Sequence, residues 1–219
     1  QILGNRADAS GGGIRVAHGT VELIDCLVRN NTAARGGGGL DASYGANAMA
    51  MTTRFLANQG AWGGGVAIRA GSTSHLYNCH ILENQATGDP GLGGGLACDL
   101  ESDVAVTYSL VADNTARHGG GIYLATGTTS QLSQLTLDRN QASDGGGGLY
   151  CADASPVLRQ SIISFHDQDA IACRRGASPT LSGCNLFGNL GGDWTGDLLY
   201  QRESHGNMSL DPLYCAATN

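Results

Sequence analysis

Apolar and polar residues alternate along most of this chain in short runs, and glycine-rich turns separate the runs. Glu22 separates Val21 from Leu23, and Leu135 and Leu137 lie among Gln, Thr and Asp residues. β-Branched Thr, Val and Ile are common in these runs. Alternation with a period of two is typical of half-buried β-strands, so the pattern predicts an all-β protein.

The alternating runs recur at a regular interval. Triple or quadruple glycine precedes an aliphatic residue six times, and the steps between successive aliphatic residues are 26, 26, 30, 26 and 27. The aliphatic residues are Ile14, Leu40, Val66, Leu96, Ile122 and Leu149. A second series of asparagines steps by 26, 27, 26, 30 and 26, and it consists of Asn5, Asn31, Asn58, Asn84, Asn114 and Asn140. Both series share one long step, which predicts a loop insertion at residues 87–92.

A repeat of this length with strand-like alternation predicts a parallel β-solenoid, in which each repeat is one coil of short strands. We expect about eight coils of roughly 26 residues. Equivalent residues of adjacent coils would then lie about 4.8 Å apart. Inward asparagines at Asn31, Asn58, Asn84, Asn114 and Asn140 would hydrogen-bond from coil to coil, and the glycines would allow positive φ and close backbone approach.

The seven cysteines fit the same repeat. Cys98, Cys151 and Cys173 share one inward position, and Cys26, Cys79 and Cys184 share another. We therefore expect small buried fillers that are not paired. A Cys173–Cys184 or Cys184–Cys215 disulfide is the alternative.

The repeat weakens after residue 165. We expect coils over residues 1–190 and an irregular capping segment over 191–219, where Trp194 would cover the open edge of the last coil. Because Gln1 lies inside a repeat unit, we also expect that earlier coils or a cap precede this chain.

Charge and composition exclude several function classes. The 219 residues include 35 glycines and 19 acidic residues, all 12 basic residues are Arg, and the net charge is −7. Without lysine, Walker-type phosphate loops and Schiff-base catalysis are excluded, and the negative surface disfavours nucleic acid. No apolar run approaches the roughly 18 residues of a membrane helix, so we expect no transmembrane segment.

Two motifs carry a resemblance to a known family. Phe55-Leu56-Ala57-Asn58 followed by Gly63-Gly64-Gly65-Val66 resembles the paired motifs of polymorphic outer-membrane proteins and related bacterial right-handed β-helix surface proteins. In other coils Leu27, Leu110 and Leu137 stand for the Phe, and the usual Gly-Gly-Ala is Gly-Gly-Gly. The end of the chain, through Asp211-Pro212-Leu213, is similar to the end of many secreted bacterial β-helix repeat proteins. The resemblance implies a right-handed parallel β-helix, an extracellular or bacterial cell-surface location, and a role in adhesion.

Candidate catalytic chemistry concentrates at the one coil whose turn differs from the rest. His166, Asp167, Asp169, Arg174 and Arg175 lie there. Two carboxylates two residues apart could hold Ca²⁺ or act as the acid and base of a glycosidase. The alternative is a solvated charged turn. The remaining histidines share no metal-ligand spacing, so we expect no zinc, and Ca²⁺ at Asp167 and Asp169 is the one cofactor that the residues suggest.

Tyr123 and Tyr150 occupy equivalent outward positions on adjacent coils. Such a pair could form a sugar-stacking or protein-binding patch, or it could be two ordinary exposed tyrosines. The favoured hypothesis for the whole chain is a non-catalytic surface β-helix that acts as an adhesin, scaffold or filament-forming segment. Its partners would be other proteins, glycans or further copies of itself. The alternative is a carbohydrate-active β-helix with a site at residues 166–175.

Overall fold

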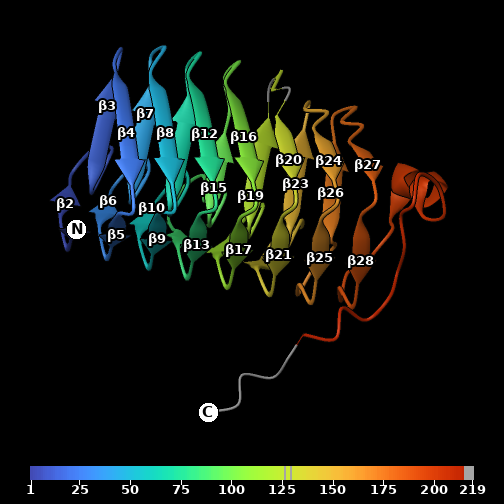
Figure 1. The fold of residues 1–219 in the computed structure, drawn as a ribbon. Helices are drawn as coiled ribbons and strands as arrows, with labels where there is room; N and C mark the ends of the chain where they lie inside the picture. The colour runs from blue at the N-terminus through green and yellow to red at the C-terminus, as the bar shows by residue number, and fades with distance from the viewer. Residues whose placement is uncertain (126, 129, 215–219) are drawn as a thin grey trace.

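The chain winds into a parallel β-solenoid of about seven turns, close to the eight that the repeat predicts (Figure 1). This is a computed structural model, and it describes residues 1–125, 127–128 and 130–214. The turns contribute short strands to four sheets, of which three extend along the whole solenoid and the fourth, sheet B, ends at β22 (Gln141–Ala142). Within the described ranges, no helix is long and apolar enough to cross a membrane.

Two sheets receive the longer strands of each coil, those that follow the glycine runs. The first of them, sheet C, contains β3 (Ile14–Ala17), β7 (Leu40–Ser43), β11 (Val66–Arg69), β15 (Leu96–Cys98), β19 (Ile122–Ala125), β23 (Leu149–Ala152) and β26 (Ile171–Arg174). The second, sheet D, contains β4 (Thr20–Ile24), β8 (Asn47–Met51), β12 (Thr73–Tyr77), β16 (Asp103–Thr107), β20 (Gln131–Ser133), β24 (Val157–Arg159) and β27 (Thr180–Ser182).

The other two sheets lie on either side of the asparagine positions. Sheet A precedes the asparagines and contains β1 (Ile2–Leu3), β5 (Leu27–Arg29), β9 (Arg54–Leu56), β13 (His80–Leu82), β17 (Leu110–Ala112), β21 (Thr136–Asp138), β25 (Ile162–Ser164) and β28 (Asn185–Phe187). Sheet B follows them and contains β2 (Arg6–Ala7), β6 (Thr32–Ala33), β10 (Gln59–Gly60), β14 (Gln85–Ala86), β18 (Thr115–Ala116) and β22 (Gln141–Ala142).

Equivalent residues pair in register from coil to coil, which stacks like side chains along the axis. Phe55 pairs with Val28 on one side and with Ile81 on the other, and all three are fully buried. The alignment of Phe55 with Leu27 and Leu110 in the sequence is therefore wrong by one residue, because Leu27 pairs with Arg54. Leu137 is aligned correctly, because it pairs with Val111 in the Phe55 column.

The glycine runs serve two geometric needs. Gly63 opens its run with a φ of 62°, a conformation that side chains rarely adopt. A Cβ on Gly65 would lie 2.7 Å from the carbonyl oxygen of Gly95 and 3.1 Å from the Asn84 side chain. Glycine is needed here because adjacent coils approach each other too closely for any side chain.

Many other corners place a residue other than glycine in the left-handed region. Tyr44 (φ 59°), Asn78 (φ 51°) and Glu83 (φ 56°) are examples at three different corners. The backbone N–H groups of Asn78 and Glu83 donate to the neighbouring coil, Asn78 to the Thr107 carbonyl oxygen (3.0 Å) and Glu83 to that of Ala112 (3.2 Å). The coil-to-coil hydrogen bond of Glu83 thus holds a conformation that its residue type does not itself favour, whereas Asn78 is of a type that adopts it more readily.

A row of buried asparagines runs along the inside of the turn between sheets A and B. The side chain of Asn58 donates to Asn84 Oδ1 (3.0 Å) and to the carbonyl oxygen of Val28 (2.9 Å), and the Asn58 backbone N–H also donates to Asn84 Oδ1 (2.9 Å). Asn84 repeats these contacts with Asn114 and Phe55. Each amide therefore satisfies both its own polar atoms and the backbone of the preceding coil.

The cysteines of the described residues are free thiols. Cys98 and Cys151 are fully buried, and desolvation raises the pKa of Cys98 to about 12 and that of Cys151 well above its usual value. Cys151 and Cys173 pair in register on adjacent strands. Cys173 and Cys184 are both free, so the Cys173–Cys184 disulfide is not formed, and Cys215 lies outside the described residues.

Residues 191–214 leave the coil pattern and pack at the end of the solenoid (Figure 1). A short 3₁₀ helix, η1 (Gly196–Gln201), buries Leu198, and the Trp194 indole N–H donates to Ser209 Oγ (2.7 Å). Gln201 Oε1 accepts a bond from the Leu181 N–H (2.8 Å). The segment therefore supplies hydrogen-bond partners to the last strand of sheet D, which has no further coil to pair with.

Candidate functional site

His166 lies in the interior and not in an exposed charged turn. Its side chain is fully buried at the next position of the asparagine row, where the ring Nδ1 accepts a hydrogen bond from the Asn140 backbone N–H (2.9 Å). The backbone N–H of His166 donates to Asn189 Oδ1 (3.1 Å). Desolvation lowers the pKa of His166 to about 3, so the ring is neutral. The expectation that His166 belongs to the charged group at residues 166–175 is therefore wrong.

The two predicted carboxylates are held at different places. Asp167 is exposed, and its Oδ1 accepts from the Ala142 N–H (2.9 Å) on β22 of sheet B. Asp169 lies at the glycine turn, where its carbonyl oxygen accepts from the Gly147 N–H (2.9 Å). Burial raises the pKa of the Asp169 carboxyl, and the charge of Arg174 opposes this shift. Arg174 Nη1 donates to the Cys173 carbonyl oxygen (3.0 Å).

These contacts do not assemble a catalytic set. No hydrogen bond or ion pair joins Asp167, Asp169 and Arg174 to one another among the described residues. The same part of the chain contains no group of three or more His, Cys, Asp or Glu side chains arranged to hold a metal ion. The Ca²⁺ hypothesis consequently rests on two carboxylates, of which that of Asp167 already accepts a backbone hydrogen bond.

The structure does bring the two predicted tyrosines together. Tyr123 on β19 and Tyr150 on β23 pair in register, and their half-buried rings stack with centroids 5.6 Å apart and an interplanar angle of 16°. The His118 ring lies against Tyr150 at 4.9 Å and 49°. Three aromatic rings therefore gather on the outer face of sheet C.

These rings line a pocket of about 240 Å³, which we call the tyrosine pocket. Its lining consists of Pro90, Leu92, Arg117, His118, Tyr123, Tyr150, Ala152 and Arg175. Sheet C forms its floor, and the turns that lead from sheet B into the glycine runs form its wall. Pro90 and Leu92 come from the insertion at residues 87–92, so the one irregular repeat contributes to this pocket.

The residue directly before a glycine run is a sequence signal for the wall that the glycine and asparagine series do not include. Trp62, Leu92 and His118 each immediately precede a glycine run, and parallel bridges join Trp62 to Leu92 and Leu92 to His118. Aligning the residue before each glycine run places these apolar and aromatic side chains in one column, but it does not show that the column lies beside the tyrosines. The glycine that follows each of these three residues has a positive φ where the chain turns toward sheet C.

Hydrogen bonds and charges fix the wall of the tyrosine pocket. His118 Nδ1 donates to the Asp144 carbonyl oxygen (2.8 Å), and the Asp144 carboxylate lies 3.6 Å from His118 Nε2 and 3.7 Å from Arg117 Nη2. Desolvation, with the charge of Asp99 adding to it, raises the pKa of Tyr123 to about 12. The Tyr123 phenol therefore stays protonated at any physiological pH and can donate a hydrogen bond.

The outer face of sheet C has a different character toward its N-terminal end. Asp41, in the same column as Tyr123, is fully buried, and its Oδ2 accepts from Arg69 Nη2 (2.8 Å) and from the Gly37 N–H (3.2 Å). Asp41 Oδ1, Ser43 Oγ and Arg69 Nε have no protein partner there. Such buried polar atoms are typical sites of ordered water.

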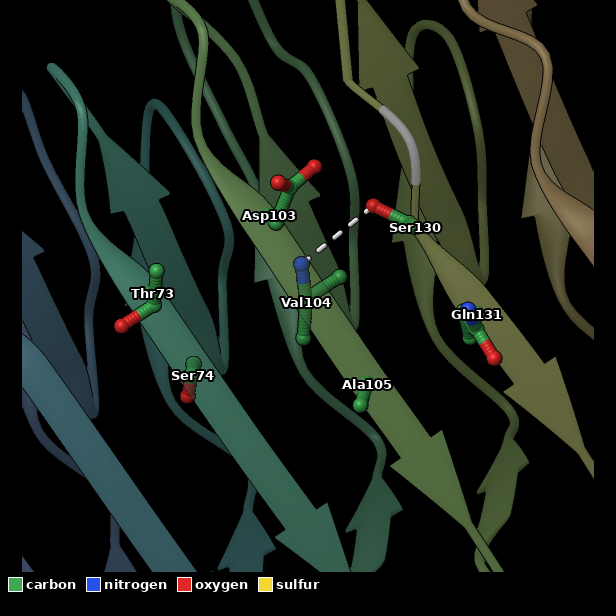
Figure 2. Close-up of a pocket in the computed structure, with 7 residues that line it drawn as sticks. All are labelled: Thr73, Ser74, Asp103, Val104, Ala105, Ser130 and Gln131. Atoms are coloured by element: carbon green, nitrogen blue, oxygen red, sulfur yellow. Dashed lines mark hydrogen bonds between the residues drawn. The ribbon is translucent and has the colours of Figure 1, made fainter.

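A second depression lies on sheet D and encloses about 320 Å³. Figure 2 shows that Thr73 and Ser74 from β12, Asp103, Val104 and Ala105 from β16, and Ser130 and Gln131 at β20 line it. The Val104 N–H donates to Ser130 Oγ (3.3 Å), which closes its floor. No aromatic or basic side chain is among these lining residues, so this depression offers less specific chemistry than the tyrosine pocket.

Comparisons with known proteins agree with the architecture. A family model described as a right-handed β-helix region matches residues 1–157 and 94–208. A probable outer membrane protein, PmpB of Chlamydia trachomatis serovar D, is 34% identical over 71 residues, which are 32% of this chain and 4% of that protein. The matched segment thus spans only a small part of the relative's length. No solved structure matches the chain.

Proposed function

Because this chain belongs to the right-handed β-helix family, we propose that it is an extracellular or cell-surface rod that binds partners through its outer side chains, as an adhesin does. Partial similarity to a probable outer membrane protein supports the surface location. The observation that carries the proposal is the tyrosine pocket. It gathers aromatic, basic and hydroxyl-bearing side chains on a rigid lateral face.

The architecture favours binding over catalysis. The inward side chains of the coils pack in the core or form the asparagine row, so only the outward side chains of each sheet can vary without loss of the fold. A carbohydrate-active site at residues 166–175 has less support. His166 is buried and neutral, and the Asp167 carboxylate is engaged by the Ala142 N–H on sheet B.

Cell-binding measurements test the adhesin proposal. Beads coated with the purified chain should attach to cultured epithelial cells, and the Tyr123→Ala/Tyr150→Ala double variant should reduce attachment about tenfold or more, since aromatic residues dominate binding sites. The matched control is Tyr77→Ala/Tyr108→Ala, because those two rings also lie close together, with centroids 5.4 Å apart, but sit elsewhere on the surface. Loss of attachment in the control but not in the pocket variant would move the binding surface away from sheet C.

Cleavage assays address the enzymatic alternative. We expect the chain to leave uronate and neutral polysaccharides intact. Cleavage by the parent chain that disappears in Asp167→Ala/Asp169→Ala would overturn the non-catalytic proposal.

A further inference from the structure

The tyrosine pocket contains hydrogen-bond donors that the protein itself does not use. Arg175 is exposed and makes no hydrogen bond or ion pair within the described residues. The phenolic hydroxyls of Tyr123 and Tyr150 likewise have no hydrogen-bond partner in that part of the chain. The other two polar side chains, those of Arg117 and His118, are already paired with Asp144. One unpaired guanidinium and two free phenols therefore converge on a single small space.

Charges of both signs lie around the pocket. The Asp144 carboxylate lies near both Arg117 and His118, and the charge of Asp99 acts on Tyr123, while the Arg175 guanidinium lines the pocket without a hydrogen bond or ion pair among the described residues. A guanidinium recognises carboxylate and other planar or tetrahedral oxyanions with paired hydrogen bonds. The pocket is therefore suited to a ligand that carries a negative charge.

The backbone around the pocket restricts the kind of ligand. Strands β15, β19, β23 and β26 pair in parallel with one another, so the N–H and C=O groups of sheet C beneath the pocket are engaged. A peptide cannot add to this face as an extra strand, because strand addition needs an unpaired sheet edge. Recognition must use side chains, and it must fit about 240 Å³. That space suits one compact ring better than a stretch of extended chain.

We propose that the tyrosine pocket binds one acidic sugar unit of a glycan, with Arg175 on its anionic group and the tyrosine hydroxyls on its ring hydroxyls. This inference deepens the proposed function by naming the class of ligand, and it rests on that proposal. Pro90 and Leu92 supply the apolar side of the pocket, against which the C–H groups of a pyranose pack. The hydrogen bond from His118 Nδ1 to the Asp144 carbonyl oxygen (2.8 Å) orients the His118 ring of the wall before the sugar arrives, which reduces the entropy lost on binding.

Ligand-detected NMR titration with two matched sugars tests the proposal. The probes are methyl β-D-glucuronide and methyl β-D-glucoside, which differ only at the carboxylate. We expect the glucuronide to bind at least tenfold more tightly than the glucoside, and Arg175→Gln to remove this difference, since hydrogen bonds to charged groups contribute a factor of about ten or more. Arg159→Gln, an exposed arginine on β24 of sheet D, is the matched control and should leave both affinities unchanged.

Further measurements distinguish the ways in which the proposal could be wrong. Equal binding of the two sugars, or loss of binding in Arg159→Gln, would overturn the role of Arg175 while leaving a neutral-sugar adhesin intact. Acetate that binds as tightly as the glucuronide would overturn the sugar and leave only a carboxylate site. If neither sugar binds but the coated beads still attach to cells through the tyrosines, the acidic-sugar inference fails and the proposed function stands.

Discussion

At the scale of single residues, the asparagine row shows how repetition makes buried polar groups tolerable. Asn84 accepts two hydrogen bonds from Asn58 and donates to Asn114 Oδ1 and to the Phe55 carbonyl oxygen, so every polar atom of its amide is used. The row ends at Asn189, whose N–H and side chain both donate to Asp193 Oδ1 (2.9 and 2.7 Å). A carboxylate suits that end because it only accepts hydrogen bonds.

Replacing one asparagine of the row should lower the free energy of unfolding. Asn84→Leu leaves the Asn58 N–H without its partner in the interior, so we expect a loss of roughly 1–3 kcal/mol. Chemical denaturation measures the loss as a lower midpoint. Asn47→Thr on the exposed face of β8 is the control and should change stability little. A neutral effect of Asn84→Leu would mean that the amide bonds contribute nothing net.

His166 interrupts the row and leaves one of its own atoms unsatisfied. Its Nδ1 accepts from Asn140, which places the proton on Nε2, and Nε2 is buried without a hydrogen-bond partner. Asparagine at this position could donate to the preceding coil, as Asn140 does to the Val111 carbonyl oxygen (2.9 Å). We therefore expect His166→Asn to stabilise the protein by about 1 kcal/mol at neutral pH. A destabilised variant in thermal unfolding would contradict this explanation.

The same histidine makes stability depend on pH. Its pKa is about 3 in the folded chain, against an ordinary value of 6.5, so between these limits the unfolded chain binds a proton that the folded chain does not. Stability should be full above pH 6.5 and should fall by up to about 1.4 kcal/mol for each unit between pH 6.5 and 3. Denaturation curves of the parent and of His166→Asn, compared from about pH 7 to about pH 4, measure this slope. A difference between the two that does not change with pH would contradict it.

At the scale of the coil, the glycine runs are predictable, and most of the other corners are not. Glycine alone combines positive φ with close contact between coils, so its recurrence reveals the turn into sheet C. The other corners hold residues such as Tyr44 and Glu83 in the left-handed region, where side-chain type gives no sign of it. Hydrogen bonds to the next coil determine these conformations, and a single sequence does not display them.

Two glycine substitutions separate these two needs. Gly71 has a φ of 70° and open space where a Cβ would lie, whereas a Cβ on Gly65 would contact the Gly95 carbonyl oxygen at 2.7 Å. Gly71→Ala should therefore cost about 1–2 kcal/mol for the left-handed conformation alone. Gly65→Ala should cost more, because two coils must move apart. Equal losses in urea denaturation would show that the coils separate without resistance.

At the scale of the whole molecule, periodicity predicts the solenoid, its register and the inward columns, but only part of the candidate site. The common column of Tyr123 and Tyr150 follows from counting residues. The charged residues around His166 favour an exposed turn. That prediction is wrong for His166 itself, whose distance of 26 residues from Asn140 places it in the row, while Asp167 and Arg174 are exposed. Arg117, His118 and Pro90 escape sequence-based prediction because wall residues meet the tyrosines only through the three-dimensional path of the turn.

A rod built from repeated coils should also unfold unevenly. Each coil contacts only its neighbours, so a defect at one end weakens the nearest coils first.

Trp194 is 7% exposed and, with Leu198, packs onto the last coils, so Trp194→Ala should cost about 3 kcal/mol locally. Hydrogen exchange in the variant should accelerate in β26, β27 and β28 while β7 and β11 keep their protection. Tyr200→Ala, on an 87% exposed side chain of the same segment, is the control. Equal acceleration along the whole chain would show that the solenoid unfolds as one cooperative unit, and the tyrosine pocket would then lose its shape whenever the C-terminal segment detaches.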